Sequence, residues 1–381
     1  MFYVLSALRA ELRQRGWFSA EGIAEPNLGN ALDLVALGTV ADVVPLDRNN
    51  RILVAGGLAR IRSGRARPGI EALFEVAGRD YRQATASDLG FIVGPRLNAA
   101  GRLDDMSIGI ECLLAESSME ARQRAETLHR LNRERRDIEQ SMEQDALKQL
   151  ASLSFDSTEL PFAMTLYDPD WHQGVIGILA SRVRERIHRP TVVFAETGDE
   201  ILKGSGRSIQ GLHLRDALDQ VATRYPGLLH KFGGHAMAAG LTLAKSDLPR
   251  FTTALEQVVT DALEQVPPVP VDDSDGGLSS GDFSLALADE LSRGGPWGQH
   301  FPEPTFDDAF SVLRHRIVGG KHLKLTLVKE DAEIEAIAFN IDVDAWTGDP
   351  PSQIHALFRL DVNEYRGART LQLVIQSFWR L

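Results

Sequence analysis

Residues 117–150 read SSMEARQRAETLHRLNRERRDIEQSMEQDALKQL, and this stretch decides how the chain is organised. Ser117 and Glu120 have the spacing of a capping box, in which two side chains satisfy backbone N–H groups at a helix start. Apolar side chains then recur at helical spacing from Ala121 to Leu150. The pattern predicts one helix of about 35 residues. Because that length exceeds most helices of globular domains, we expect it to bridge two domains.

The outward face of this predicted helix is rich in arginine. A solvated surface with ordinary ion pairs is the commoner reason for such a face, and contact with a nucleic acid is the alternative. The arginines are Arg122, Arg124, Arg130, Arg133, Arg135 and Arg136.

Downstream of the predicted helix, the chain has the pattern of an α/β module. Short apolar runs at 162–167 and 191–195 alternate with helical patterns at 175–187 and 246–265. Alternation of this kind predicts strands and helices that pack as layers.

The last part of the chain is expected to form a separate domain. Residues 266–281, VPPVPVDDSDGGLSSG, combine proline, glycine and acidic residues, which is a linker composition. Beyond them, apolar and polar residues alternate around Leu325, Ala336 and Leu373, and a period of two predicts strands. Several strands in about 100 residues favour a small barrel or sandwich.

Two apolar segments precede the long helix. Residues 31–46, ALDLVALGTVADVVPL, predict a buried helix or strand that ends in a loop at Pro45. Residues 1–16 place Leu8 and Leu12 on one helical face, and no capping residue precedes that face. We therefore expect the chain to begin inside a domain.

The composition is that of a globular protein with an excess of acidic residues. The chain has 381 residues, 53 acidic against 41 basic, and a net charge of −12. A polyanion must therefore meet a local basic groove, because the molecule as a whole repels it. No apolar run is long enough to span a membrane, and the single Cys112 excludes an internal disulfide and a CxxC zinc site. We expect a cytoplasmic protein of two or three domains.

Asp42 is the first residue that could carry chemistry. Its neighbours are Val40-Ala41 and Val43-Val44, so its carboxylate would be costly to bury without an ion or a hydrogen-bond donor. Divalent cations such as Mg²⁺ prefer carboxylate oxygens. A structural aspartate that caps a helix or turn is at least as common, and both interpretations stay open.

Two further segments have the residue types of a phosphate site. In GPRLNAAGR (94–102), Arg96 and Asn98 lie among small residues that permit close approach of a ligand, although a surface loop with ion pairs fits as well. In KGSGRS (203–208), glycines accompany hydroxyl and guanidinium groups as in an anion nest. A turn between two strands explains those glycines equally well, and the Walker A pattern is not matched.

The segment HKFGGHAMAAG (230–240) is a third candidate. Gly233 and Gly234 precede His235, and a helix that started there could hold a phosphate at its N-terminus with the histidine as donor or proton shuttle. A structural histidine is the commoner case. His172 leads into a predicted helix, and we favour a capping role for it.

The sequence contains no GxSxG, HExxH or GxGxxG motif, so nucleophile-elbow hydrolases, zincins and dinucleotide-binding proteins have no support. Three phosphate-compatible segments and one unusual aspartate remain. Together they favour binding or cleavage of phosphodiesters.

Taken in order, these motifs resemble the RecJ family of single-strand-specific DNA exonucleases, in the DHH phosphoesterase superfamily. The resemblance covers almost the whole chain. It rests on ALGTVADVVPL (36–46), GPRLNAAGRL (94–103), WHQGVIGILASRV (171–183), SGRS (205–208), GGHAMAAGL (233–241) and GPWGQHFPEP (295–304).

The resemblance implies an α/β protein of four parts. Residues 1–110 would be the C-terminal part of a DHH phosphoesterase domain, 111–153 a connecting helix, 154–265 a DHHA1 domain, and 266–381 a linker with an OB-type β-barrel. The implied activity is 5′→3′ hydrolysis of single-stranded DNA in repair and recombination, with two Mn²⁺ or Mg²⁺ ions. Implied partners are single-stranded DNA, a single-strand-binding protein and a helicase.

The resemblance also implies roles for single residues. Asp42 would be a metal ligand, and His235 would be catalytic. The substrate-binding residues would be Arg96, Asn98, Ser205, Arg207, Ser208, Gly233 and Gly234.

The sequence departs from the family at its start. The family's earlier motifs, an Asp-x-Asp pair, a further aspartate and the Asp-His-His triplet, lie upstream of the position of Asp42, and no such residues occur here. We therefore expect Met1 to be an internal residue of a longer protein, and the chain alone to hold at most one of the metal ligands.

A binding module without catalysis is the alternative function. DHHA1 and OB domains could hold single-stranded DNA by a basic groove and by stacking on aromatic rings, although such rings are more often part of a core. Hydrolysis of short oligonucleotides or cyclic dinucleotides is disfavoured, because an OB-type domain suggests a long strand. The candidate aromatics are Trp297, Phe301, Trp346 and Tyr365.

Overall fold

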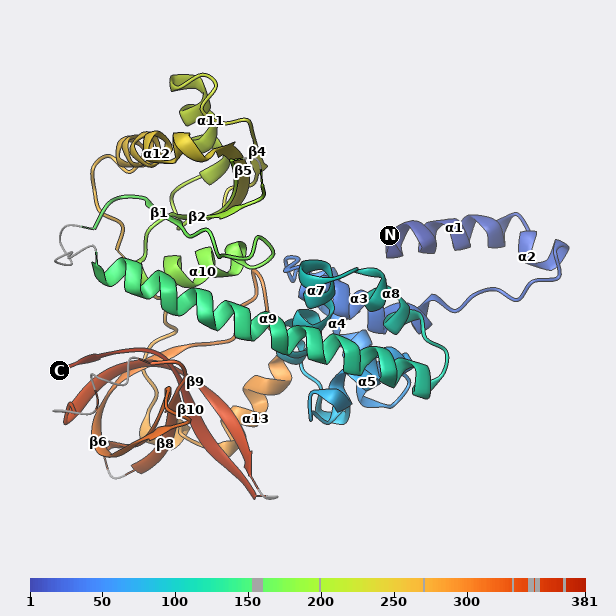
Figure 1. The fold of residues 1–381 in the computed structure, drawn as a ribbon. Coiled ribbons are helices and arrows are strands. Elements are labelled where there is room, and N and C mark those ends of the chain that lie inside the picture. Colours follow the sequence, from blue (N-terminus) through green and yellow to red (C-terminus); the bar gives the residue numbers. More distant parts are fainter. Residues whose placement is uncertain are drawn as a thin grey trace. The chain divides into compact units, whose positions relative to one another are not determined.

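A computed structural model gives the fold (Figure 1). Its described residues form two compact units. It describes residues 1–152, 160–198, 200–269, 271–330, 332–341, 346, 350–365 and 368–381. Unit 1 comprises residues 1–95, 113–122 and 272–381, and unit 2 comprises residues 96–112 and 123–271.

Unit 1 begins with short helices. The segment 31–46, predicted as a helix or strand, is a helix that ends at Ala41. The elements are α1 (Phe2–Gln14), α2 (Trp17–Ala20), η1 (Leu28–Ala31), α3 (Leu32–Ala41), α4 (Arg48–Arg62), α5 (Pro68–Val76), η2 (Tyr81–Gln83), α6 (Ala86–Asp88) and η3 (Leu89–Val93).

The first helix of the chain leaves its apolar face in solvent. Helix α1 contains no buried residue, and Val4 and Leu8 are exposed at 63% and 51%. The predicted helix at 1–16 therefore exists, but its apolar side chains contribute nothing to a core.

The buried carboxylate of unit 1 belongs to Asp33. Its side chain is fully buried and accepts hydrogen bonds from the backbone N–H groups of Leu34 at 2.9 Å and Arg67 at 2.8 Å. Arg67 is the N-cap residue of α5. Asp33 thus ties α3 to the start of α5 and satisfies a donor that would otherwise be left without a partner.

The C-terminal part of unit 1 is a closed five-stranded barrel in the order β10-β8-β7-β6-β9. The predicted alternation is confirmed, since Leu325, Ala336 and Leu373 all lie in the barrel core. The strands are β6 (Phe306–Val318), β7 (His322–Lys329), β8 (Ala332–Ala338), β9 (Gln353–Tyr365) and β10 (Ala368–Arg380).

The expected linker is partly attached to the barrel. Asp275 donates its N–H to the carbonyl of Thr305, and Gly276 accepts from the N–H of Asp307. The turn η5 (Ser280–Asp282) and helix α13 (Leu285–Gly294) then follow, and Ala288 of α13 packs into the barrel core.

Long helix α9 (Ser118–Ser152) has 35 residues, as predicted, and its residues from Gln123 onward belong to unit 2 (Figure 1). The hydroxyl of Ser117 accepts a hydrogen bond from the N–H of Glu120 at 3.2 Å, which is one half of the expected capping box. Helices α7 (Gly94–Leu103) and α8 (Ser107–Leu114) precede it.

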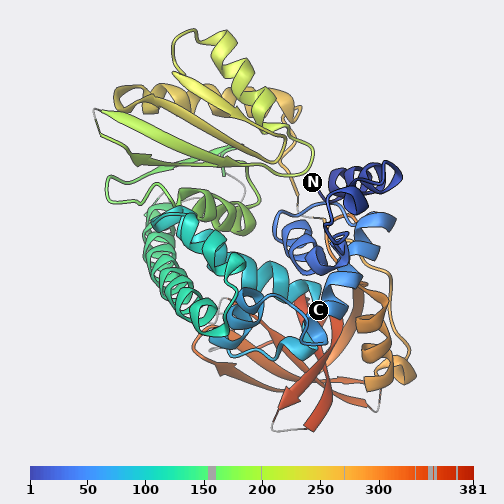
Figure 2. The same ribbon diagram turned by 90° about the vertical axis from the view of Figure 1, so that its right-hand side faces the viewer.

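The rest of unit 2 is a five-stranded sheet in the order β1-β2-β3-β5-β4, seen with its helices in Figure 2. The strands are β1 (Met164–Tyr167), β2 (Thr191–Glu196), β3 (Ile201–Arg207), β4 (Lys231–Gly234) and β5 (Ala238–Ala244). Strands β1 and β2 are parallel and the other neighbours are antiparallel.

Helices cover both faces of this sheet. Val192 and Phe194 of β2 pack with α11 (Leu214–Arg224) and α12 (Leu248–Ala262). Val193 and Ala195 of the same strand pack with α10 (Ile176–Ile187) and with α9. This three-layer packing confirms the α/β prediction and fixes α10 against the sheet.

The single cysteine, Cys112, is buried in unit 2. Burial raises the pKa of its thiol to about 11, so the thiol is protonated at neutral pH.

The structure contains no helix among its described residues that is long and apolar enough to cross a membrane.

We expect Asp33→Ala to destabilise unit 1 by about 1–3 kcal/mol, because the N–H of Arg67 loses its buried acceptor. Asp33→Asn keeps an acceptor oxygen and should cost less. Chemical denaturation followed by circular dichroism measures both variants, with the exposed Asp104→Ala as the control. Equal stability of the Ala variant and the wild type would show that the Asp33 bonds are dispensable.

Candidate nucleic-acid interface

Strand β3 carries two of the predicted phosphate-binding residues, Ser205 and Arg207. The segment KGSGRS is therefore mainly a strand, and both earlier interpretations, a nest and a turn, are wrong. Its glycines are needed for packing: a Cβ at Gly204 would lie 2.5 Å from the ring of Phe194, and one at Gly206 would lie 2.7 Å from Leu214. Closely packed neighbours on the face of the sheet that these two glycines share exclude side chains there.

The side chains of Ser205 and Arg207 lie against the first turn of α10. Arg207 donates from Nη1 to the hydroxyl of Ser205 at 3.2 Å and to the carbonyl of Gly206 at 2.8 Å. A Cβ on Gly177 would lie 2.9 Å from Nη2 of Arg207 and 3.0 Å from Oγ of Ser205. Gly177 is therefore what lets this guanidinium lie so close to the helix.

A second guanidinium, that of Arg102 on α7, reaches the same helix. Its Nη1 donates to the carbonyl of Gly174 at 3.0 Å, just before α10. Burial first, and then Arg102 and Arg184, lower the pKa of Arg207. Within the described part of the chain, no carboxylate bonds to Arg207. We call Arg102, Arg207 and Ser205 the arginine site, since two like charges held there at the start of a helix favour a bound anion.

A network of charged side chains on α9 and α10 lies close enough to Arg102 to affect its pKa. Glu139 of α9 binds Arg135 at 2.6 Å and Arg182 of α10 at 3.2 Å. Burial and Arg135 lower the pKa of Arg102, whereas Glu139 raises it. Arg135 was expected on the exposed face, but it is only 8% exposed and bonds to Asn132 and Glu139. The sequence signal that was missed is the Arg135–Glu139 pair at helical spacing i,i+4.

The segment GPRLNAAGR forms helix α7, so the surface-loop interpretation is wrong. Ala99 and Ala100 are fully buried, which explains the small residues by packing. Arg96 is 5% exposed and donates from Nε to Nδ1 of His129 at 3.3 Å. Asn98 is exposed.

The Gly-Gly-His segment is a β-hairpin between β4 and β5, and no helix starts there, contrary to the prediction. The N–H of His235 donates to the carbonyl of Ala238 at 2.8 Å, and its side chain is exposed. Gly234 has φ of 147°, and a Cβ there would lie 2.4 Å from the Ala238 carbonyl. Because Arg207 of β3 pairs with Ala238, this hairpin lies at the same sheet edge as the arginine site.

Ser208 and His172 serve the protein itself. Ser208 is 1% exposed, and its hydroxyl donates to the carbonyl of Leu212 at 2.8 Å, so a substrate contact by this side chain is not supported. Nδ1 of His172 accepts from the N–H of Gly174 at 3.1 Å in the turn before α10. Helix α10 has Val175 as its N-cap and no side-chain cap, so the predicted capping role is wrong and the bond closes the turn before the helix.

Asp42 belongs to unit 1, at the C-cap of α3, and is exposed. The expected burial of its carboxylate is wrong, because the helix ends there and the exposed Val43 follows with φ of 54°. The described residues contain no group of three or more His, Cys, Asp or Glu side chains that could hold a metal ion. They therefore do not fit a two-metal centre.

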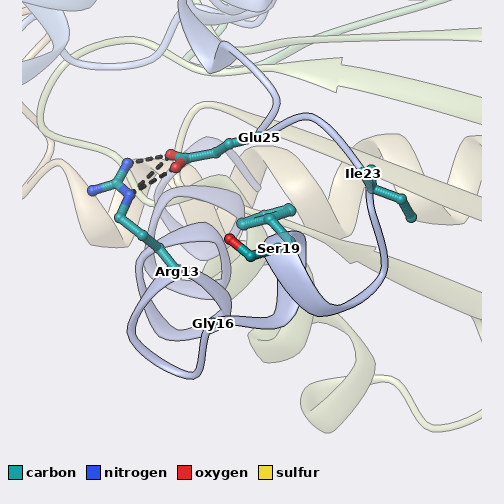
Figure 3. Close-up of a pocket in the computed structure, with 6 residues that line it drawn as sticks. Arg13, Gly16, Ser19, Ile23 and Glu25 are labelled. Atoms are coloured by element: carbon teal, nitrogen blue, oxygen red, sulfur yellow. Dashed lines mark hydrogen bonds and ion pairs between the residues drawn. The ribbon is translucent and has the colours of Figure 1, made fainter.

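Unit 1 contains a cavity of about 240 Å³ that is lined by residues between Arg13 and Glu25 (Figure 3). The exposed ion pair of Arg13 and Glu25 borders it, with Gly16, Ser19 and Ile23. The hydrogen bond from Arg13 is the main cause that lowers the pKa of Glu25. No sequence-predicted site residue lines this cavity.

The aromatic candidates of the barrel region are largely structural. Trp346 is 2% exposed and belongs to the barrel core, while Trp297 stacks on Phe301 at 5.0 Å. The side chain of Tyr365 lies outside the described residues. Trp379, which the sequence analysis did not single out, is 50% exposed and stacks on His355 at 4.7 Å.

The covered sheet, the arginine site and the barrel together define a DHHA1-containing protein with an OB-type barrel. Residues 160–261 match the DHHA1 domain, and residues 274–377 match the RecJ OB domain. The chain belongs to the RecJ family.

Individual relatives agree with this assignment. The single-stranded-DNA-specific exonuclease RecJ of Dickeya dadantii is 53% identical over 100% of this chain and 66% of its own length, and that of Escherichia coli is 51% identical over 99% and 66%. A crystal structure of RecJ in complex with Mg²⁺ from Thermus thermophilus has a TM-score of 0.77 at 28% identity, over 96% of this chain and 54% of that one. The chain thus spans slightly less than two thirds of these curated relatives.

We expect Gly177→Ala to weaken anion binding at the arginine site, because the added Cβ displaces the guanidinium of Arg207. The measurement is the rise in melting temperature caused by inorganic phosphate, which should shrink in the variant. Gly38→Ala is the matched control, a helical glycine in α3 with nothing within 4 Å of the added Cβ. Both variants gain helix propensity. An undiminished rise for Gly177→Ala would mean that the close approach is irrelevant to binding.

Proposed function

We propose that this chain holds the 5′ end of a single DNA strand for a single-strand-specific 5′→3′ exonuclease of DNA repair and recombination. The arginine site is the observation that supports this most directly. Arg207 is half-buried, and the positive charge of Arg102 acts on it. It bonds to no carboxylate among the described residues. A phosphate would supply the missing negative charge.

A terminal phosphate suits this site better than an internal one. It carries a charge of about −1.5 to −2 at neutral pH and three acceptor oxygens, whereas an internal phosphodiester carries a single charge. Guanidinium groups bind phosphate oxygens through two parallel N–H donors, and Ser205 offers a hydroxyl beside Arg207. The site would therefore recognise where a strand begins.

The hydrolytic role rests on the relatives. Their printed names state single-stranded-DNA-specific exonuclease activity, and solved structures of RecJ contain Mg²⁺ or Mn²⁺. We propose that the exonuclease to which this chain contributes uses divalent ions as well, and that Asp42 of unit 1 supplies at most one of their ligands. In unit 2, His235 would act near the scissile phosphate. Gly233, Gly234, Arg96 and Asn98 would line the strand.

A binding module without catalysis is the second candidate. The lack of a metal-binding group of three or more side chains among the described residues favours it for the 381-residue chain by itself. The OB-type barrel and the basic groups of unit 2 can bind a single strand without cutting it. Association with a single-strand-binding protein and a helicase is proposed from the family resemblance, as are the four domain boundaries given above.

We expect the wild-type chain to bind a 5′-phosphorylated oligonucleotide about tenfold more tightly than its 5′-hydroxyl counterpart, as charge-assisted hydrogen bonds of this kind are worth about 1.5–3 kcal/mol. Arg207→Ala should remove that preference. Fluorescence anisotropy measures both affinities, and Arg215→Ala on the exposed face of α11 is the control. A preference that survives in Arg207→Ala would reject the assigned role.

We expect the purified chain to digest single-stranded DNA little or not at all with Mn²⁺, since one exposed aspartate cannot hold two ions. Release of nucleotides from a labelled strand measures this, and a full-length relative such as that of Escherichia coli is the positive control. Metal-dependent digestion at a comparable rate would show that the described residues suffice for catalysis.

A further inference from the structure

A second basic cluster lies on the long helix, away from the arginine site's own residues. His129, Arg133 and Arg136 are at positions i, i+4 and i+7 of α9, so their side chains share one face. Arg133 and Arg136 are exposed and His129 is half-buried. Arg96 of α7 joins them, with Nε and Nη2 each 3.3 Å from Nδ1 of His129. We call these four residues the helix cluster.

The contact with Arg96 fixes the state of the imidazole. A guanidinium can only donate, so Nδ1 of His129 must be the acceptor and the ring proton lies on Nε2. Burial, and then Arg96, Arg133 and Arg136, lower the pKa of His129. The imidazole is thus neutral at pH 7 and offers an N–H donor on the side away from Arg96.

The two exposed arginines of the helix cluster are not balanced by carboxylates. Two other arginines on this helix are paired, Arg124 with Glu111 and Arg135 with Glu139. In contrast, Arg133 and Arg136 form no ion pair within the described ranges. Burial and the like charge of Arg136 also lower the pKa of Arg96. Three guanidinium groups are therefore held together by the fold although they repel one another.

We propose that the helix cluster is a second anion-binding site, which binds internal backbone phosphates of the strand whose end lies at the arginine site. This proposal rests on the proposed function. Arg96 and Arg102 are six residues apart on α7, about 9 Å along the helix axis, so one helix presents a basic group to each site. The ligand of the helix cluster is a singly charged phosphodiester, and contacts of this kind carry no base specificity.

The two sites predict different effects on how DNA affinity depends on salt and on a phosphate at the 5′ end. Each internal phosphate that is neutralised releases counterions, so the slope of log affinity against log salt changes by about 0.7 per phosphate for a single strand. Loss of the helix cluster should lower this slope whether or not the 5′ end carries a phosphate. Loss of the Arg207 side chain should lower affinity only for strands that carry a 5′ phosphate.

The test compares Arg133→Ala/Arg136→Ala with Arg215→Ala/Arg250→Ala, which removes the same charge from exposed positions of α11 and α12. Anisotropy with 5′-phosphorylated and 5′-hydroxyl oligo(dT) is measured over a range of KCl concentrations. We expect the slope of the first variant to fall by about 1.4 and its affinity to fall severalfold for both ends. The control should keep both values. Arg133→Lys/Arg136→Lys retains the charge and should keep most of the slope.

Folding does not confound this comparison, because both positions are exposed and alanine favours a helix. Circular dichroism confirms the helix content. The proposal would be overturned if the slope of the Arg133→Ala/Arg136→Ala variant equalled that of the control. It would also be overturned if the lysine variant lost as much slope as the alanine variant. If Arg207→Ala abolishes end preference while the slope is unchanged, the helix cluster alone is rejected. If the slope falls but no end preference exists, the arginine site is rejected instead.

Discussion

The repulsion between Arg102 and Arg207 is the constraint on which the rest of unit 2 depends. Burial lowers the pKa of both side chains, so the fold holds two cations where each is less stable than in water. Such an arrangement persists only if the surrounding packing enforces it. The first turn of α10, with Gly177 as the point of contact, is what brings the guanidinium of Arg207 to its position.

Packing enforces the arrangement from both sides of the sheet. One face buries Phe194 against α11 and α12, which leaves space for no side chain at Gly204. On the opposite face, Glu139 joins α9 to α10 through Arg135 and Arg182. The single carboxylate offsets part of the positive charge without reaching Arg207. Helix α9 therefore supports the site electrostatically.

Features with local causes could be predicted from the sequence, and features with tertiary causes could not. Helix α9 follows from a capping serine and a 3.6-residue period, and the barrel strands follow from a period of two. The glycines of β3 were misread because their reason is the ring of Phe194, which is distant in sequence. Asp42 was likewise misjudged: it shares one apolar stretch with Asp33, and only the packing of α5 decides that Asp33 is the buried one.

The state of Cys112 has a practical consequence. A fully buried thiol with a pKa of about 11 has almost no thiolate at pH 7, and thiolate is the form that reacts with maleimides and related reagents. Cysteines introduced at exposed positions can therefore be labelled with fluorophores while the native residue is left in place. The natural sequence already provides the background that distance measurements between its two units require.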